Sequence, residues 1–290
     1  MAKLTRRTAL MQIASIVAGA GLFSSGQLAA QPVGELRFGL TPVFLNNDIE
    51  LLEKLKTYLA TATGYPIKLV QRRTYQEVTS LLISGELDAA WICGYPFVKN
   101  RERLKLVAVP VWNGKPLYQA YLITGKDRDV SSFTDLKGDL HAFSDPDSNS
   151  GYLVTRALLA ELKERPESYF SSTFFTYGHR NVVRAIASGL ADSGSVDGYV
   201  WEAMRKTEPD LINQTKVIRK SEWLGFPPIA CSRSMVSSDK LSALSPAILN
   251  MESNADGRAA LALLGLDSFK QFPPSLYDDI AAKVALIEVG

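Results

Sequence analysis

The residues with the clearest binding chemistry lie in one short segment, FSDPDSNSGYLVTRALL at positions 143–159. Its pattern predicts a strand, then a turn dense in Asp, Pro, Ser and Asn, then a helix that begins near Gly151. The first turn of a helix offers N–H donors and a partial positive charge. The hydroxyls of Ser148 and Ser150 and the amide of Asn149 add donors at the same spot. The segment can therefore hold an anion, although an ordinary helix cap uses the same residue types.

Further polar side chains are predicted at the ends of strands, where α/β proteins commonly bind ligands. His179 follows one such strand, and its imidazole can donate to an oxygen, although a lone histidine is also a common helix cap. Tyr95 and Cys93 end a strand in the first half of the chain. A tyrosine suits a cleft wall, whereas a buried cysteine is commonly a small apolar filler. Asp197 and Glu202 lie at the matching strand end of the second half.

Two similar blocks of alternating strands and helices must position these residues. The first block has predicted strands at 36–41, 67–71 and 89–93, and helices at 48–62 and 75–84. The second block has predicted strands at 141–144, 173–177 and 195–200, and helices at 152–163 and 181–188. This alternation predicts right-handed βαβ units and a mainly parallel sheet in each block, flanked by helices.

Two β-type segments, 117–124 and 225–234, are placed to cross between the blocks, and the chain after about residue 241 has a helical pattern. The layout predicts an α/β clamp of two lobes with two crossing hinge strands. Lobe 1 is expected to comprise residues 31–120 and 225–290, and lobe 2, residues 121–224, is expected to be inserted within it.

The first thirty residues have the pattern of a targeting segment. Lys3, Arg6 and Arg7 precede an uncharged apolar run at 9–23, and small residues follow near position 30. This order predicts a secretory signal peptide over residues 1–30 and export to the periplasm. The Arg6–Arg7 pair resembles a twin-arginine export signal. An uncleaved N-terminal anchor is the alternative.

The composition excludes several classes of protein. The 290 residues are 46% hydrophobic and 21% charged, and the chain beyond the first thirty residues has 29 basic and 30 acidic side chains. Without a basic excess or stripe, the chain does not read as a nucleic-acid binder. The two cysteines, Cys93 and Cys231, could form one disulfide, which their spacing leaves open. The sequence has no metal-ligand cluster, no nucleotide-binding loop and no hydrolase elbow, so we expect no metal, no cofactor and no enzyme activity.

Several segments resemble the periplasmic phosphonate- and phosphite-type binding proteins of ABC importers. In order along the chain they are GLTP (39–42), SGELDAAWICGYPFV (84–98), DPDSNSGY (145–152), YGHRNVVRAIASGLAD (177–192), VDGYVW (196–201) and GFPPI (225–229). The resemblance covers most of the chain after the targeting segment. It implies a type II periplasmic-binding fold with the ligand held between two lobes.

The resemblance also implies roles for individual residues. Ser148, Asn149, Ser150 and His179 are expected to face a small oxyanion, namely phosphonate, phosphite or phosphate. The family more often has Thr where Asn149 stands. Cleft carboxylates hold the ammonium group in aminoalkylphosphonate binders of this type, which makes Asp197 and Glu202 candidates for that role.

The expected partners are the small oxyanion and an ABC permease, with the protein itself a monomer. One alternative is a periplasmic sensory protein that docks on a membrane histidine kinase. Cys93 keeps an arsenite sensor open, because a soft thiolate would favour arsenic(III) over hard oxyanions. An enzyme that acts on phosphonates is a third hypothesis.

Overall fold

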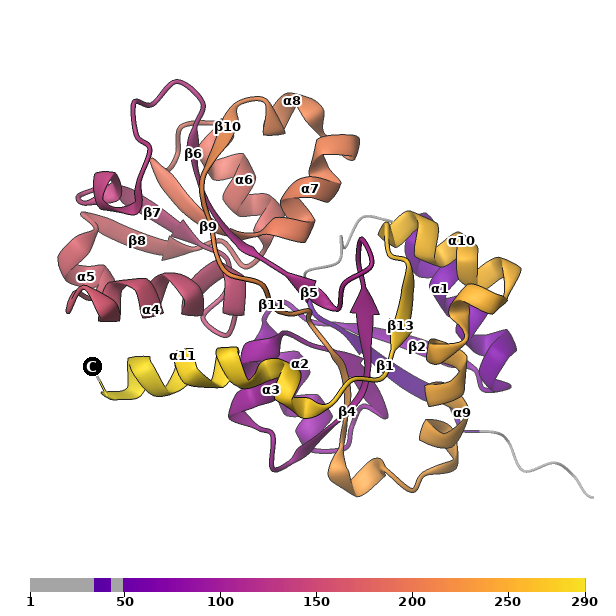
Figure 1. The fold of residues 1–290 in the computed structure, drawn as a ribbon. Helices are drawn as coiled ribbons and strands as arrows, with labels where there is room; N and C mark the ends of the chain where they lie inside the picture. The colour runs from indigo at the N-terminus through magenta and orange to yellow at the C-terminus, as the bar shows by residue number, and fades with distance from the viewer. Residues whose placement is uncertain (1–33, 43–48, 290) are drawn as a thin grey trace, which may run out of the picture. The chain divides into compact units, whose positions relative to one another are not determined.

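The computed structural model describes residues 34–42 and 49–289. The predicted signal peptide, residues 1–30, lies outside the described residues. No helix in the part of the chain that the structure describes is long and apolar enough to cross a membrane. Within the compact unit that begins at Gly34, two larger sheets carry helices on their faces, and each sheet with its helices is called a lobe below (Figure 1).

The first lobe is built on a six-stranded sheet with the order β13-β4-β12-β3-β1-β2. Its strands are β1 (Leu36–Leu40), β2 (Ile67–Gln71), β3 (Ala89–Trp91), β4 (Leu104–Val111), β12 (Ile229–Ser232) and β13 (Ser268–Lys270). β1 runs parallel to β2 and β3, whereas β12 runs antiparallel to β3 and β4. The strands of this central sheet are therefore contributed by both ends of the chain.

Helices of the first lobe follow the predicted amphipathic pattern. They are α1 (Ile49–Thr63), α2 (Tyr75–Ile83), α3 (Gly94–Lys99), α9 (Asp239–Leu249), α10 (Ala255–Leu264) and α11 (Asp278–Val289), with short 3-10 turns at Arg233–Met235, Met251–Ser253 and Pro274–Tyr277. α1 buries Leu51, Leu55 and Leu59, which lie on one face at helical spacing. α2 begins at a capping box, in which Thr74 accepts from the Glu77 N–H and the Glu77 side chain accepts from the Thr74 N–H.

The second lobe is built on a five-stranded sheet with the order β10-β6-β9-β7-β8. Its strands are β6 (Ala120–Gly125), β7 (Leu140–Phe143), β8 (Ser172–Phe175), β9 (Ser193–Asp197) and β10 (Thr215–Lys220). Its helical elements are a 3-10 turn at Phe133–Leu136, a π-helical turn at Asn149–Leu153, α4 (Val154–Glu161), α5 (Pro166–Tyr169), α6 (His179–Ala187), α7 (Gly198–Thr207) and α8 (Pro209–Ile212).

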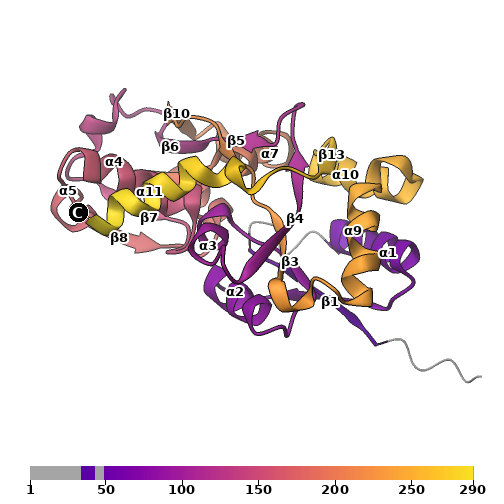
Figure 2. The ribbon, with the colours of Figure 1, turned by 60° about the horizontal axis from the view of Figure 1, so that its bottom comes forward.

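The chain passes between the lobes along a short antiparallel pair, β5 (Leu117–Tyr118) and β11 (Leu224–Gly225). β5 leads into β6 of the second lobe, and β11 follows β10 and leads back to β12. The two predicted crossing segments therefore lie side by side. α11 adds a further link, since it packs against α3 of the first lobe and α4 of the second (Figure 2).

Three details differ from the sequence-based expectations. The sheets are mixed rather than mainly parallel, because β12 and β4 in one lobe and β6 and β10 in the other pair antiparallel. The predicted strand 195–200 ends at Asp197, whose Oδ1 accepts the N–H groups of Tyr199 and Val200 and so starts α7. The helix expected from 152 begins earlier, as the π-helical turn at Asn149.

Candidate functional site

The first residues of two helices, one from each lobe, meet at the centre of the candidate site. Tyr75 begins α2 and His179 begins α6. The Tyr75 hydroxyl lies 3.1 Å from Nε2 of His179, and both side chains are buried. His179 was predicted from the sequence, and Tyr75 was not.

The contact made by the second ring nitrogen of His179 indicates where the imidazole carries its proton. The Asp197 backbone N–H donates to Nδ1 of His179 at 3.1 Å, so Nδ1 is an acceptor and carries no proton. Burial lowers the pKa of His179 to about 3, which keeps the imidazole neutral near pH 7. The remaining proton is then on Nε2, which acts as a donor toward Tyr75.

Asn149 joins the second lobe to the first. Its backbone N–H donates to Sγ of Cys93 at 3.2 Å, and its Nδ2 donates to the Tyr118 hydroxyl at 2.8 Å. Its Oδ1 is buried and has no hydrogen-bond partner. Ser148 acts as an ordinary cap, because its Oγ accepts the Gly151 N–H at 3.0 Å.

Two more buried hydroxyls near the start of this helix are unsatisfied. Oγ of Ser144 and Oγ of Ser150 make no hydrogen bond, although Ser150 lies close enough to Asp197 to lower the pKa of that carboxyl in part. Buried polar atoms in folded proteins nearly all have partners. Together with Oδ1 of Asn149, they leave unused hydrogen-bonding capacity in one short segment.

Gly151 allows this helix start to approach His179. A Cβ atom at Gly151 would lie 1.8 Å from Oγ of Ser144 and 3.0 Å from Cε1 of His179. No side chain fits in that space, since real Cβ atoms do not approach other heavy atoms to 1.8 Å. The glycine therefore brings the unsatisfied hydroxyls and the imidazole to one place.

The buried polar side chains of Tyr75, Ser144, Asn149, Ser150 and His179 are called the cluster below. Cys93 lies in the same cluster, directly before α3. Burial raises its pKa to about 12, so the sulfur is a thiol that accepts from Asn149. Cys93 and Cys231 are both buried and free, so the possible disulfide between them is not formed.

Of the predicted site residues Asp197, Glu202 and Tyr95, the structure places only Asp197 in the cluster. Asp197 is buried in the cluster, and burial raises its pKa to about 7. Glu202 is directed elsewhere: Oε1 accepts from the Tyr121 hydroxyl at 3.1 Å and Oε2 accepts from Arg205 at 2.7 Å. The ring of Tyr95 lies 5.1 Å from the ammonium of Lys99. The structure does not bring Glu202 or Tyr95 together with His179.

Sequence reasoning missed Tyr75, Tyr118 and the carboxylate of Asp145. Oδ2 of Asp145 accepts the Tyr75 N–H at 3.2 Å, so a carboxylate of the second lobe lies at the start of α2 in the first. One signal was present in the sequence, because the segments that begin at Tyr75 and His179 are similar. Each continues to a short helix preceded by a residue of the cluster, Cys93 before α3 and Asp197 before α7.

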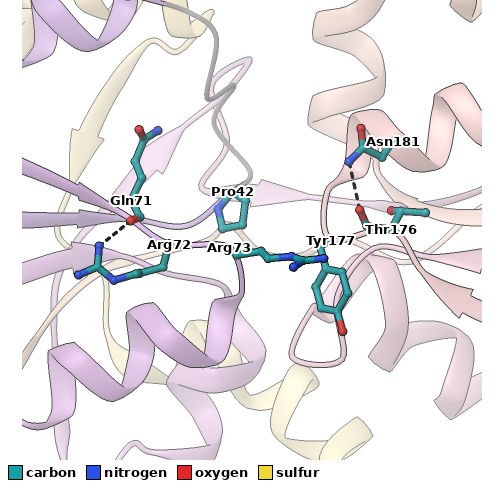
Figure 3. A pocket seen from close by; sticks show the side chains of 7 residues that line it. All are labelled: Pro42, Gln71, Arg72, Arg73, Thr176, Tyr177 and Asn181. Carbon is teal, nitrogen blue, oxygen red and sulfur yellow. Dashed lines mark hydrogen bonds between the residues drawn. The ribbon is translucent and has the colours of Figure 1, made fainter.

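A pocket of about 680 Å³ lies beside this cluster, between loops of the two lobes (Figure 3). Its described lining consists of Pro42, Gln71, Arg72, Arg73, Thr176, Tyr177 and Asn181. The two loops lead directly into Tyr75 and His179. Among the residues that the structure describes, no group of three His, Cys, Asp or Glu side chains could hold a metal ion.

The family described as "ABC transporter, phosphonate, periplasmic substrate-binding protein" matches residues 38–277. The phosphate-import protein PhnD of Mycolicibacterium smegmatis is 29% identical over 189 residues, which cover 61% of this chain and 57% of that protein. The phosphonates-binding periplasmic protein of Escherichia coli is 25% identical over 162 residues, 54% of this chain and 47% of that protein. The chain thus spans about half the length of the curated relatives it matches.

Solved structures show the same fold. A binding protein component of an ABC phosphonate transporter from Pseudomonas aeruginosa has a TM-score of 0.81 at 22% identity, covering 88% of this chain and 86% of that one. PhnD1 from Prochlorococcus marinus, solved in complex with methylphosphonate, has a TM-score of 0.78 at 17% identity, covering 89% and 99%. The two-lobed type II periplasmic-binding fold expected from the sequence is confirmed.

Proposed function

Since the chain belongs to the family of phosphonate ABC-transporter periplasmic substrate-binding proteins, as its sequence predicted, we propose that it captures a small phosphorus oxyanion and delivers it to a membrane permease. One observation carries the proposal. Two buried hydroxyls without partners, on Ser144 and Ser150, lie at a helix start beside the Nε2–H donor of His179. The names of the two curated relatives, which refer to phosphate and phosphonates, support this class of ligand.

The site would hold the anion with neutral donors. The hydroxyls of Ser150 and Tyr75 and the Nε2–H of His179 can each donate to an oxyanion placed between them. Hydrogen bonds to charged groups contribute roughly 1.5–3 kcal/mol each. Three or four such bonds are enough for micromolar affinity, which corresponds to about −8 kcal/mol, after the cost of association.

Binding would be coupled to movement of the lobes. The Tyr75–His179 hydrogen bond occupies the Nε2–H that the ligand needs, and the Asn149–Tyr118 hydrogen bond is a second side-chain link at the lobe junction. Opening about the β5–β11 pair would separate these partners, and closure would bring both lobes onto the ligand. Each lobe would then supply part of the site.

The low pKa of His179 and its hydrogen-bond partner suit a ligand-binding residue better than a catalytic base. A general base works best with a pKa near the working pH, whereas burial lowers that of His179 to about 3. Its Nδ1 accepts from a backbone N–H, so no carboxylate orients the ring as in a hydrolase triad. The named relatives are binding proteins, and we propose that this chain is not an enzyme.

We further propose that the protein acts in the periplasm after export through its N-terminal segment. This extends to the chain what its family description says of location. The Arg6–Arg7 signal and the cleavage near position 30 remain predictions from sequence.

Thermal unfolding with a panel of anions tests the proposed function. Phosphate, phosphite and methylphosphonate should each be titrated against the mature chain. A bound anion at about a hundred times its dissociation constant should stabilise the protein by about 2.7 kcal/mol. Ser150→Ala should reduce this gain, whereas Ser242→Ala, an exposed serine of α9, should not. A panel without any stabilising anion would refute the proposal.

A further inference from the structure

The pocket between the loops has a basic rim. Its described lining includes two arginines, Arg72 and Arg73, and no acidic residue. Clefts with one sign of charge concentrate ligands of the opposite sign. The rim therefore favours a negatively charged group in the pocket.

The pocket is lined by residues that come just before Tyr75 and His179 in the same two loops. Arg73 lies two residues before Tyr75, and Tyr177 lies two residues before His179. Two residues of extended chain span at most about 7 Å. Because Tyr75 and His179 are hydrogen bonded to each other, a ligand held beside them can reach the arginines through a chain of only a few bonds.

Arg73 already reaches across the lobes. Its guanidinium carbon lies 5.5 Å from the centre of the Tyr177 ring, and Figure 3 shows the side chain extended toward that ring. Tyr177 has a φ of 54°, a left-handed conformation that is uncommon for residues other than glycine. Arg72 donates from Nη1 to the carbonyl of its neighbour Gln71 at 2.8 Å. Both arginines are exposed, so their side chains can turn toward a bound anion.

The acidic side chains in and near the cluster are engaged with donors of the protein. Both oxygens of Asp145 accept backbone N–H groups, and Oδ1 of Asp197 does the same. Glu202 is engaged with Arg205 and Tyr121, away from the cluster. These carboxylates therefore already have donors within the protein, whereas Arg72 and Arg73 are exposed beside the pocket.

We infer, on the basis of the proposed function, that the ligand carries a second acidic group a few bonds from its phosphorus oxyanion, and that Arg72 and Arg73 bind this group. A carboxylate or a second phosphorus acid has the right chemistry, because a guanidinium pairs with either through two parallel hydrogen bonds. The phosphorus oxyanion lies in the buried cluster, and the second group lies in the pocket of Figure 3.

Isothermal titration calorimetry with four probes tests the inference: inorganic phosphate, methylphosphonate, phosphonoacetate and 2-aminoethylphosphonate. The wild type should bind phosphonoacetate at least about tenfold more tightly than methylphosphonate. In the double variant Arg72→Gln/Arg73→Gln this preference should fall to within about twofold, with methylphosphonate affinity unchanged. Lys126→Gln/Lys206→Gln removes the same charge at exposed positions elsewhere and should keep the preference.

The outcomes separate the two claims. If methylphosphonate binds but phosphonoacetate has no advantage, or 2-aminoethylphosphonate binds most tightly, the inference is wrong and the proposed function stands. The inference is also wrong if the arginine variant loses both probes equally. If no probe binds the wild type, the proposed function and the inference fail together.

Discussion

The hydroxyl of Tyr75 and Nε2 of His179 lie 3.1 Å apart, although 104 positions separate them in the chain. Each residue is the first of a helix that follows a strand, one in each lobe. A contact between helix starts of different lobes places two donors where two partial positive charges converge. This relationship, more than any single side chain, makes the cluster suited to an anion.

Tyr75→Phe should weaken anion binding while the fold remains intact. The ring still fills its buried space, but the hydroxyl that lies beside His179 is lost. Removal of one donor to a buried anion costs roughly 1–3 kcal/mol, a fall in affinity of about 5- to 150-fold. Titration calorimetry with methylphosphonate measures the change, after circular dichroism has shown an unchanged fold. Wild-type affinity in this variant would remove Tyr75 from the site.

His141 and His179 should differ in how their substitution by alanine affects anion affinity. His141 is fully buried between the hydroxyls of Ser193 and Ser195, at 2.8 Å from each, and stacks on Phe170. His141→Ala should therefore lower the free energy of unfolding by about 3–5 kcal/mol, the usual cost of truncating a large buried ring. Its affinity for anions, measured where it is folded, should stay near that of the wild type.

His179→Ala should also lower the free energy of unfolding, because its ring is buried, but unlike His141→Ala it should reduce anion affinity, by about 5- to 150-fold, through loss of the Nε2–H donor. Urea unfolding and calorimetry on both variants make the comparison. Equal losses of affinity in the two would contradict the assignment of His179 to the site and His141 to the core.

The free energy of unfolding should depend on pH because of Asp197. Burial raises the pKa of Asp197 to about 7 from its usual 3.8. Between about pH 4 and 7 the folded state therefore holds a proton that the unfolded chain has released, so this group destabilises the fold as pH rises through that window. Asp197→Asn removes the effect and keeps an oxygen that can cap α7.

Relative to wild type, the Asn variant should thus become progressively more stable from pH 5 to 7 and then level off. Urea unfolding of both proteins at pH 5, 6, 7 and 8 measures the difference. The two buried histidines are present in both proteins, so their titration cancels. A difference that does not change with pH would show that Asp197 is already ionised throughout.

Much of the fold could be predicted from the sequence because its signals are local. The apolar runs that form β1 and β2 match their predicted positions within a residue, and the turn chemistry of 143–159 marks the helix start to within a few residues. The error at 195–200 is also local in origin. Gly198 to Val200 continue an apolar run that suits a strand, but the carboxylate of Asp197 caps a helix there instead. The helix then carries Glu202 away from the cluster.

The rest of the site depends on contacts that no local pattern contains. Tyr118 is linked to Asn149 across 31 positions, and Asp145 to Tyr75 across 70. An isolated tyrosine at the start of a predicted helix has no feature that distinguishes a site residue from a core residue. Only the packing of one lobe on the other brings these groups together.

Gly151→Ala should abolish binding and destabilise the fold, because the new methyl group has no room. Its carbon would lie 1.8 Å from Oγ and 2.7 Å from Cβ of Ser144, and 3.0 Å from Cε1 of His179. Either the helix start or the imidazole must move, and overpacking of this kind costs typically 1–3 kcal/mol. Gly125→Ala is the matched control, since its nearest neighbour would be Cγ of Arg128 at 3.9 Å, an ordinary contact. Thermal unfolding and calorimetry with methylphosphonate should show loss of stability and of binding in the first variant and neither loss in the second. If Gly151→Ala binds the anion normally, the close approach of the helix start to His179 is not required for recognition, and the site must lie elsewhere in the cleft.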